Sequence, residues 1–259
     1  MVSVNLCTDQ LAMMLAAPGQ LVSVSHLASD PRSSVMVAEA AGYDANRGGA
    51  EEVYLMRPDL VLAGTYTARA SVELLRRLGV VVVEVPPASR LADVAEQLRI
   101  VGAALGQGAR AETLVAEFEA GLAALRIRTD APVRAAMYYP NGYTTGAGTL
   151  ADEILSVTGF ANVGAAAGVT GGGILPLERL VMAAPDLVVT SAPYPGASRS
   201  EEILAHPALV AVRGAAAAAM VSDAEWVCGL PQILRAVAGM AAAHRAIRDA
   251  VQVTRADGE

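Results

Sequence analysis

Aromatic and metal-ligating side chains are scarce in this chain of 259 residues. Only 4% of the residues are Phe, Trp or Tyr, and there are just 3 His and 2 Cys. The His residues stand apart, and neither an H-x-H nor a C-x-x-C pair occurs, so a prebuilt zinc or manganese site is not expected. A Gly-rich phosphate loop and a Ser-His-Asp order are also missing. We therefore expect no cofactor, no protein-bound metal and no catalytic residues.

Long hydrophobic runs and clusters of basic residues are missing too. No window holds about 18 or more uninterrupted apolar residues, so no membrane span is expected. The formal net charge is −7 and the Arg residues are scattered, which argues against a nucleic-acid partner. The strand-like Val2-Ser3-Val4 begins at once, so we expect a signal peptide to be absent from this chain.

One sequence pattern occurs twice in the chain. Residues 51–64 read EEVYLMRPDLVLAG, and residues 178–191 read ERLVMAAPDLVVTS. In both, a Glu opens the segment, a Pro follows seven residues later, and Asp-Leu-Val comes next, at a common offset of 127 residues. This period is far too long for a solenoid and indicates two similarly built lobes.

Each copy predicts a short helix followed by a buried strand. A Glu stabilises a helix N-terminus, and a Pro cannot continue a helix, so Pro58 and Pro185 are expected to end the two helices. The apolar runs 60–63 and 187–189 lack polar alternation, which is typical of strands covered on both faces in a parallel sheet. The residues expected to form the buried faces of the two helices are Val53, Leu55, Met56, Leu180, Val181 and Met182.

Strands and helices alternate in both halves of the chain, as in βαβ units. Between the halves, apolar residues at helical spacing predict one helix over 91–105 and another over 109–127. The predicted fold class is α/β, with two lobes that are each a mainly parallel sheet flanked by helices and are joined by a single long backbone helix. The predicted domains are an N-terminal lobe at 1–105, a linking helix at 106–130 and a C-terminal lobe at 131–259.

The loops at the carboxyl ends of the predicted strands hold most of the aromatic side chains. Ligands of doubly wound lobes bind at these loops. Rings with one polar tip suit a large ligand that is part apolar and part hydrogen-bonding. The candidate ligand-binding residues are Asn5, Cys7, Asp9, His26, Tyr66, Tyr139, Tyr143, Thr144, Tyr194, Glu225 and Trp226.

Several of these residues also have a structural interpretation. Tyr138 and Tyr139 straddle a strand end, so one of the two is expected in the core. Trp226 is also explained as a plug at the base of a lobe, and His26 as a locally satisfied histidine. His26 is the one histidine placed for an axial or hydrogen-bonding contact to a ligand.

The two cysteines leave a pairing question. Cys7 and Cys228 are expected in loops of opposite lobes, 221 positions apart. A disulfide between them is possible in an oxidising compartment, but the sequence does not supply the distance between them. Buried thiols are slightly favoured.

Several segments in order carry a resemblance to a known family. They are the paired Glu-to-Val segments 51–61 and 178–188, Leu78-Gly79 before a strand, the linking helix, Gly146 within TTGAGTLADEIL, and the segment 222–226 before the last helix. Over essentially its whole length the chain resembles the substrate-binding proteins of ABC importers for vitamin B12, iron–siderophore complexes and haem. The resemblance implies a bilobed monomer that holds its ligand between the lobes, located in the periplasm or on an outward-facing lipid anchor.

The resemblance also assigns roles. One surface Glu of each lobe docks onto arginines of the permease dimer, which implies Glu51 and Glu178, with Glu52 as a neighbouring alternative. The structural alternative is that each Glu only stabilises its helix, by about 0.3–1 kcal/mol. The expected partners are the permease dimer with its ATPase subunits, which would provide the only membrane contact, and a metal-chelate or corrinoid molecule. The ligand could be an iron–siderophore, cobalamin or haem.

Two other classes of protein compete with this hypothesis. The first is a cytoplasmic α/β enzyme or a metallocluster-type protein with duplicated lobes. The second is a scaffold protein, which would not need aromatic residues in its loops. The missing catalytic and ligating motifs argue against the enzyme.

Overall fold

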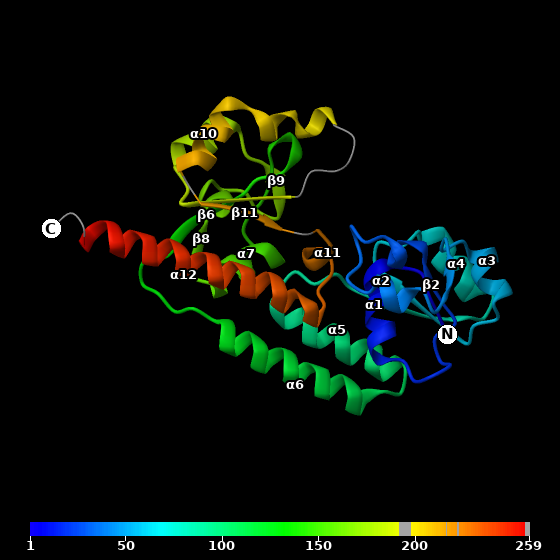
Figure 1. Cartoon of the computed structure of the whole chain (residues 1–259). Helices are drawn as coiled ribbons and strands as arrows, with labels where there is room; N and C mark the ends of the chain where they lie inside the picture. Colours follow the sequence, from blue (N-terminus) through cyan, green and yellow to red (C-terminus); the bar gives the residue numbers. More distant parts are fainter. Residues whose placement is uncertain (192–197, 216, 222, 257–259) are drawn as a thin grey trace. The chain divides into compact units, whose positions relative to one another are not determined.

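The chain folds into two compact units. The computed structural model describes residues 1–191, 198–215, 217–221 and 223–256 (Figure 1). The first unit comprises Met1–Ala120 and Ala224–Ile233, and the second comprises Gly121–Asp223 and Leu234–Glu259. The chain therefore passes from one unit to the other three times, because a short segment of the second half returns to the first unit. The boundaries predicted from the sequence stay a prediction.

Each unit contains one parallel sheet. The strands of the first unit are β1 (Val2–Ser3), β2 (Ser23–Ser25), β3 (Asp44–Asn46), β4 (Leu60–Gly64) and β5 (Val81–Val85). Those of the second unit are β6 (Val133–Met137), β7 (Tyr143–Thr145), β8 (Phe160–Asn162), β9 (Gly172–Ile174), β10 (Leu187–Ser191) and β11 (Ala217–Val221). The first sheet has the order β3-β2-β1-β4-β5, and the second has the order β11-β10-β6-β8. All pairs within them are parallel, whereas β7 and β9 form a separate antiparallel pair.

Helices occupy the connections between the strands. The α-helices up to the unit boundary are α1 (Leu6–Leu15), α2 (Val37–Ala40), α3 (Ala50–Leu55), α4 (Arg69–Arg77), α5 (Leu91–Ala104) and α6 (Gly108–Leu125). Those that follow are α7 (Leu150–Val157), α8 (Val163–Ala166), α9 (Leu177–Ala183), α10 (Pro207–Ala215), α11 (Asp223–Trp226) and α12 (Leu234–Ala256). The 3-10 helices are η1 (His26–Ser29), η2 (Pro140–Gly142), η3 (Arg199–Ala205) and η4 (Pro231–Ile233).

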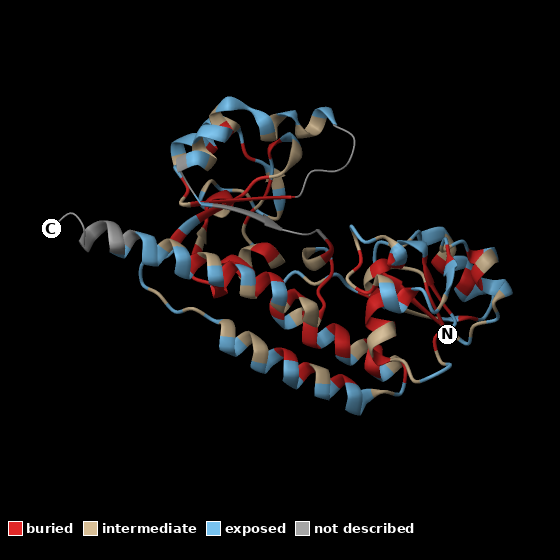
Figure 2. Ribbon diagram, in the orientation of Figure 1, coloured by how far each residue is buried: buried red, intermediate tan, exposed pale blue. Residues whose placement is uncertain are grey.

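The sheets are covered on both faces, as the unbroken apolar runs predict. Val61, Leu62 and Ala63 follow one another along β4 and are all fully buried. Figure 2 shows buried segments, in red, within the strands and helices of each unit. Since successive side chains of a strand point to opposite faces, helices must cover both sides of this sheet. The α/β fold class with parallel sheets is thereby confirmed.

The repeated sequence pattern folds into a similar structure in each unit. The helix of each copy, α3 or α9, precedes a strand, β4 or β10, that lies between the first strand of its unit and a further strand. Val53 and Leu180 occupy equivalent helix positions and are both fully buried. Each helix also stops in the same way, because the residue before the Pro takes a left-handed conformation, with φ 50° at Arg57 and φ 42° at Ala184.

Part of the predicted buried face is wrong. Leu55 is 80% exposed, Met182 is 85% exposed and Val181 is 41% exposed. The cause is the length of the helices, because α3 has 6 residues and α9 has 7. With about 3.6 residues per turn, so short a helix turns only one or two side chains fully towards its sheet.

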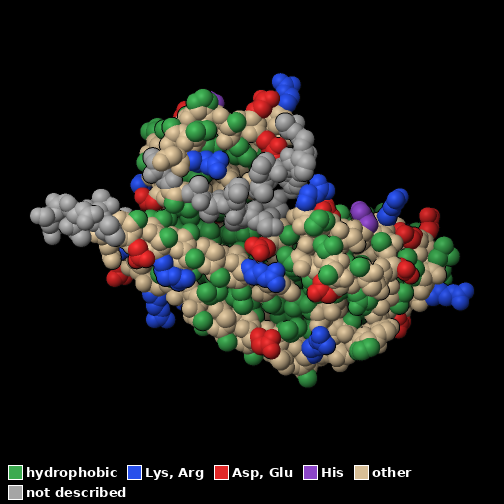
Figure 3. All heavy atoms as spheres, viewed as in Figure 1, with side chains coloured by type: hydrophobic (Ala, Val, Ile, Leu, Met, Phe, Trp, Pro, Cys, Tyr) green, Lys and Arg blue, Asp and Glu red, His purple; other side chains and the backbone are tan. Residues whose placement is uncertain are grey.

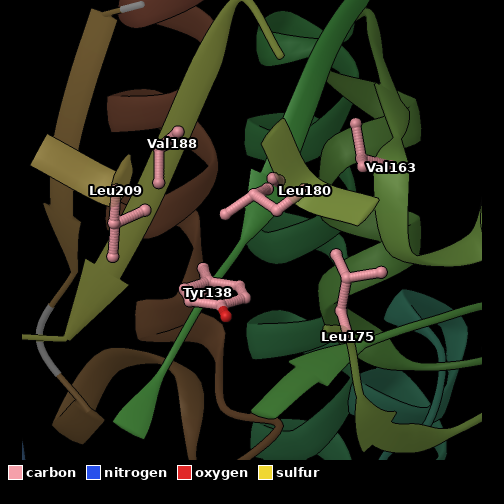
Figure 4. Packing of buried hydrophobic residues seen from close by; sticks show 7 residues of the cluster. Tyr138, Val163, Leu175, Leu180, Val188 and Leu209 are labelled. Carbon is pink, nitrogen blue, oxygen red and sulfur yellow. The ribbon is translucent and has the colours of Figure 1, made fainter. Parts of the chain in front are cut away.

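The core of the second unit surrounds a tyrosine. Tyr138 is fully buried among Leu180, Val188 and Leu209, which come from α9, β10 and α10, and Leu175, which lies between β9 and α9 (Figure 4). Tyr139, the next residue, is only partly buried. The expectation that one of these two tyrosines belongs to the core is therefore confirmed, and it is Tyr138.

Candidate functional site

The candidate site of the first unit lies where its strand order reverses. The chain after β1 continues to β2 on one side, whereas β4 lies on the other side of β1, so the loops after β1 and β4 flank a switch point. Asn5 follows β1, and its side-chain oxygen accepts hydrogen bonds from the backbone N–H groups of Cys7 (3.0 Å) and Thr8 (3.4 Å). These bonds cap α1 and fix where the helix begins.

A glycine brings the second loop of this switch point close to the first. A Cβ atom placed on Gly64, at the end of β4, would lie 2.9 Å from the side chain of Asn5. Only a glycine allows the backbone of β4 to approach Asn5 in this way. Sequence reasoning did not single out Gly64, although a glycine that ends a buried strand signals such a close approach.

Asp9 is a buried carboxyl group in α1. Its Oδ2 accepts a hydrogen bond from the hydroxyl of Ser25 at 2.5 Å, and its Oδ1 has no partner among the described residues. Burial raises the pKa of Asp9 to about 6, while the hydroxyls of Ser25 and Ser3 work in the opposite direction. The hydrogen bond that holds this carboxyl inside the unit comes from Ser25, a residue that the sequence analysis did not single out.

The other candidates of the first half are exposed. His26 begins η1, directly after β2, and is exposed. Tyr66 follows β4 and is 87% exposed. Its neighbours Thr65 and Thr67 line a pocket of about 280 Å³ together with charged residues of α4 and β5. A hydrogen-bonding recess therefore lies beside an exposed aromatic ring.

Cys7 and Cys228 form a disulfide bond, with their Cα atoms 5.3 Å apart. The slight preference for thiols was wrong, and so was the placement of the two residues in opposite lobes. The reason is the returning segment 224–233, which belongs to the first unit although it follows nearly all of the second. Within it, the side-chain amide of Gln232 contacts the sulfur of Met14 at 3.5 Å.

The returning segment adds two candidate residues to the first unit. Glu225 and Trp226 are both partly buried, in or at the end of α11. The indole Nε1 of Trp226 is buried and has no acceptor among the described residues. Trp226 is therefore partly enclosed, and its N–H is a hydrogen-bond donor without a partner among the described residues.

The candidate site of the second unit follows β6. Tyr139 and Tyr143 lie at the two ends of η2, with ring centroids 6.4 Å apart and ring planes inclined by 41°. Tyr143 is 44% exposed. Thr144 is fully buried and donates its hydroxyl hydrogen to the backbone oxygen of Met137, so it supports this loop. Tyr194 lies outside the described residues.

The hydroxyl group of Tyr138 lies beneath this loop. It is buried and has no partner among the described residues. Burial raises the pKa of Tyr138, and the negative charge of Glu178 raises it further. The charge of Glu178, a residue predicted to dock, therefore acts on the buried phenol of Tyr138.

Glu51 and Glu178 are both exposed in the first turns of α3 and α9. Neither forms an ion pair with any residue that the structure describes. Glu52 is partly buried, and its carboxylate accepts a hydrogen bond of 2.9 Å from the backbone N–H of Arg47. Of the two candidates in the first unit, Glu51 is therefore the one available to a partner.

Two larger pockets lie on the second unit, away from the predicted ligand residues. One, of about 420 Å³, is lined by residues of β6, β8, α8 and α9, including Arg134, Arg179 and Met182. The other, of about 780 Å³, is lined by residues of α9, α10, β11 and α12. Neither includes a residue that the sequence analysis proposed for the ligand.

The charged and metal-ligating side chains are dispersed. Figure 3 shows Arg and acidic side chains spread over the visible face of the molecule. Among the described residues, no three His, Cys, Asp or Glu side chains are grouped so that they could hold a metal ion. Within the same part of the chain, no helix has the length and apolarity required to cross a membrane.

Comparison with known proteins identifies the family. The model of the family described as periplasmic binding protein matches residues 1–220. The chain belongs to this family. An uncharacterised ABC transporter substrate-binding lipoprotein, YvrC of Bacillus subtilis strain 168, is 26% identical over 201 residues. That alignment covers 73% of this chain and 62% of YvrC, so the chain matches less than two thirds of the relative's length.

Solved structures of the family share the fold. The periplasmic haem-binding protein RhuT from Roseiflexus sp. RS-1, in its apo form, superimposes with a TM-score of 0.78 at 22% identity, covering 95% of this chain and 97% of RhuT. The periplasmic vitamin B12 binding protein BtuF of Vibrio cholerae gives a TM-score of 0.67 at 17% identity, covering 95% of this chain and 96% of BtuF. At these identities the likeness shows the fold.

Proposed function

We propose that this protein is the substrate-binding component of an ABC importer. It captures a metal-chelate or corrinoid-type molecule and delivers it to a membrane permease without chemical change. The observation that carries the proposal is its membership of the periplasmic binding protein family over residues 1–220. The disulfide bond supports a location outside the cytoplasm, in the periplasm or on an outward-facing lipid anchor, because disulfides persist in oxidising compartments.

The residues proposed to contact the ligand lie in loops that follow strands within each unit. Tyr66 in the first unit, and Tyr139 and Tyr143 in the second, offer rings with a hydroxyl tip. Asn5, His26 and Trp226 add hydrogen-bonding groups in the first unit. Haem, cobalamin and ferric siderophores are all large molecules with apolar and hydrogen-bonding parts, and such aromatic groups suit them.

A fluorescence titration tests the ligand site. Trp226 is the single tryptophan, so its emission reports directly on the candidate site. We expect quenching by at least one of haemin, cyanocobalamin and a ferric hydroxamate. We further expect Tyr66→Ala or Tyr143→Ala to weaken binding about tenfold, which corresponds to about 1.4 kcal/mol.

Tyr54→Ala is the matched control, because Tyr54 is also 44% exposed but lies on α3, away from the switch points. Its affinity should equal that of the unchanged protein. Unchanged affinity of both Tyr66→Ala and Tyr143→Ala would contradict the assignment of the site.

Docking on the permease uses Glu51 and Glu178. One exposed carboxylate in the same place on each unit fits a partner with two equivalent basic sockets, as a permease dimer provides. The protein is proposed to act as a monomer that contacts the membrane only through the permease and its ATPase subunits. Transport should therefore require both glutamates, whereas ligand capture should not.

A double substitution separates these two roles. Glu51→Gln combined with Glu178→Gln should abolish uptake and change the ligand affinity less than twofold. The control is Glu39→Gln combined with Glu202→Gln, which removes one exposed carboxylate from each unit elsewhere on the surface. Equal loss of binding and uptake in the first variant contradicts this division of roles.

A further inference from the structure

The two repeat helices share an exposed apolar residue as well as an exposed glutamate. Leu55 on α3 is 80% exposed, and Met182, at the equivalent position on α9, is 85% exposed. Each lies four residues after its glutamate, so Glu51 with Leu55, and Glu178 with Met182, share one face of their helix. Both positions recur at the offset of the repeat.

The intervening surface positions are shared only in part. Glu52 in the first copy corresponds to Arg179 in the second, which reverses the charge, whereas Tyr54 and Val181 are equivalent positions that are 44% and 41% exposed. The buried positions of the repeat do match, which packing alone explains. Packing does not explain why a large apolar side chain faces solvent at the same place in both units, because each would be more stable buried.

We propose that Leu55 and Met182 are the apolar anchors of the docking surface to which Glu51 and Glu178 also belong. The partner is the permease dimer, each half of which would offer a basic group for the glutamate and an apolar pocket about one helical turn away. This inference rests on the proposed function. An apolar contact beside an ion pair excludes water, which strengthens the attraction between the charges.

The charges on α3 and the glutamates of both copies argue against two other occupants of this surface. Glu51 and Glu52 stand in the first turn of α3, so an anionic lipid surface would be repelled there. A second copy of this chain, docked through the same face, would bring like-charged glutamates together. A partner that carries a basic group beside an apolar pocket meets neither difficulty.

The test measures docking directly. The full chain is titrated onto the purified permease–ATPase complex of the source organism in lipid nanodiscs, with protein-free nanodiscs in parallel. Leu55→Gln and Met182→Gln should each weaken docking about tenfold, and the two together about 100-fold, because each substitution replaces an apolar side chain that is buried on docking with a polar one. The conservative pair Leu55→Met and Met182→Leu should restore docking to within about threefold.

Matched controls are Val81→Gln and Val210→Gln, which place the same polar side chain at exposed apolar positions of the first and second unit. Both should dock as the unchanged protein does. Circular dichroism and ligand affinity of all variants should stay unchanged, which shows that the fold is intact.

The outcomes separate this inference from the proposed function. If the Glu51→Gln and Glu178→Gln pair loses docking while the Leu55 and Met182 variants dock normally, the apolar anchors are refuted and the importer function stands. If neither set affects docking, the docking surface itself is refuted. Binding to protein-free nanodiscs, or self-association in analytical ultracentrifugation, that depends on Leu55 and Met182 would overturn the inference in favour of a membrane or a second copy.

Discussion

The buried carboxyl of Asp9 makes the stability of this protein depend on pH in a predictable direction. The pKa of Asp9 is raised by burial from 3.8 to about 6 in the folded chain. The folded state therefore holds the proton more tightly than the unfolded state does, so the free energy of unfolding falls as the pH rises from about 4 to about 6 and is constant above that range. The difference of about two pKa units corresponds to a loss of about 3 kcal/mol in the free energy of unfolding at pH 7 and above, and this loss disappears below pH 4.

Asp9→Asn removes the ionisation and keeps an oxygen that can accept the hydrogen bond from Ser25. The variant should match the original protein in stability near pH 4 and exceed it by up to about 3 kcal/mol at pH 8. Urea unfolding, followed by circular dichroism at several pH values between 4 and 8, measures this difference. The comparison between the two proteins cancels the contributions of all other titrating groups.

Asp44→Asn is the control, because Asp44 is an exposed carboxyl group on β3 of the same unit. This substitution should change the free energy of unfolding by less than about 0.5 kcal/mol throughout. A constant difference between Asp9→Asn and the original protein from pH 4 to pH 8 would refute the reasoning. So would a variant that loses stability relative to the original as the pH rises.

Two further predictions concern the covalent and backbone structure. Cys7→Ser combined with Cys228→Ser should lower the free energy of unfolding by about 3–5 kcal/mol, because the disulfide closes a very long loop. Thermal unfolding with and without a reductant checks this. Equal stability of the oxidised and the reduced protein contradicts it. Arg57→Gly and Ala184→Gly should each raise that free energy by about 0.5 kcal/mol, because glycine relieves the left-handed conformation before each Pro. A loss of more than 1 kcal/mol in both glycine variants would show that the side chains at these positions contribute more than the strain costs.

The sequence predicted the architecture well because the repeat carries strong local signals. Pro58 and Pro185 end their helices, and the apolar runs after them form β4 and β10. Each run is buried on both faces, which is why its pattern lacks polar alternation. The prediction that one of two adjacent tyrosines lies in the core follows from the same alternation of side chains along a strand.

Three features could not be predicted because they depend on long-range packing. The disulfide joins residues 221 positions apart, through a segment that returns to the first unit. The exposure of Leu55, Val181 and Met182 depends on how two very short helices are rotated against their sheets. The burial of Asp9 depends on Ser3 and Ser25, whose strands meet α1 only in the folded unit.

The most direct test of the importer function is native mass spectrometry of the protein purified from its source organism. The account predicts one added mass per chain, equal to that of a haem, a corrinoid or a ferric chelate, which is lost on denaturation while the chain mass stays unchanged. Copurification of a nucleotide or of a covalently modified chain, together with no uptake of haemin, cyanocobalamin or ferric hydroxamate on incubation, would contradict it.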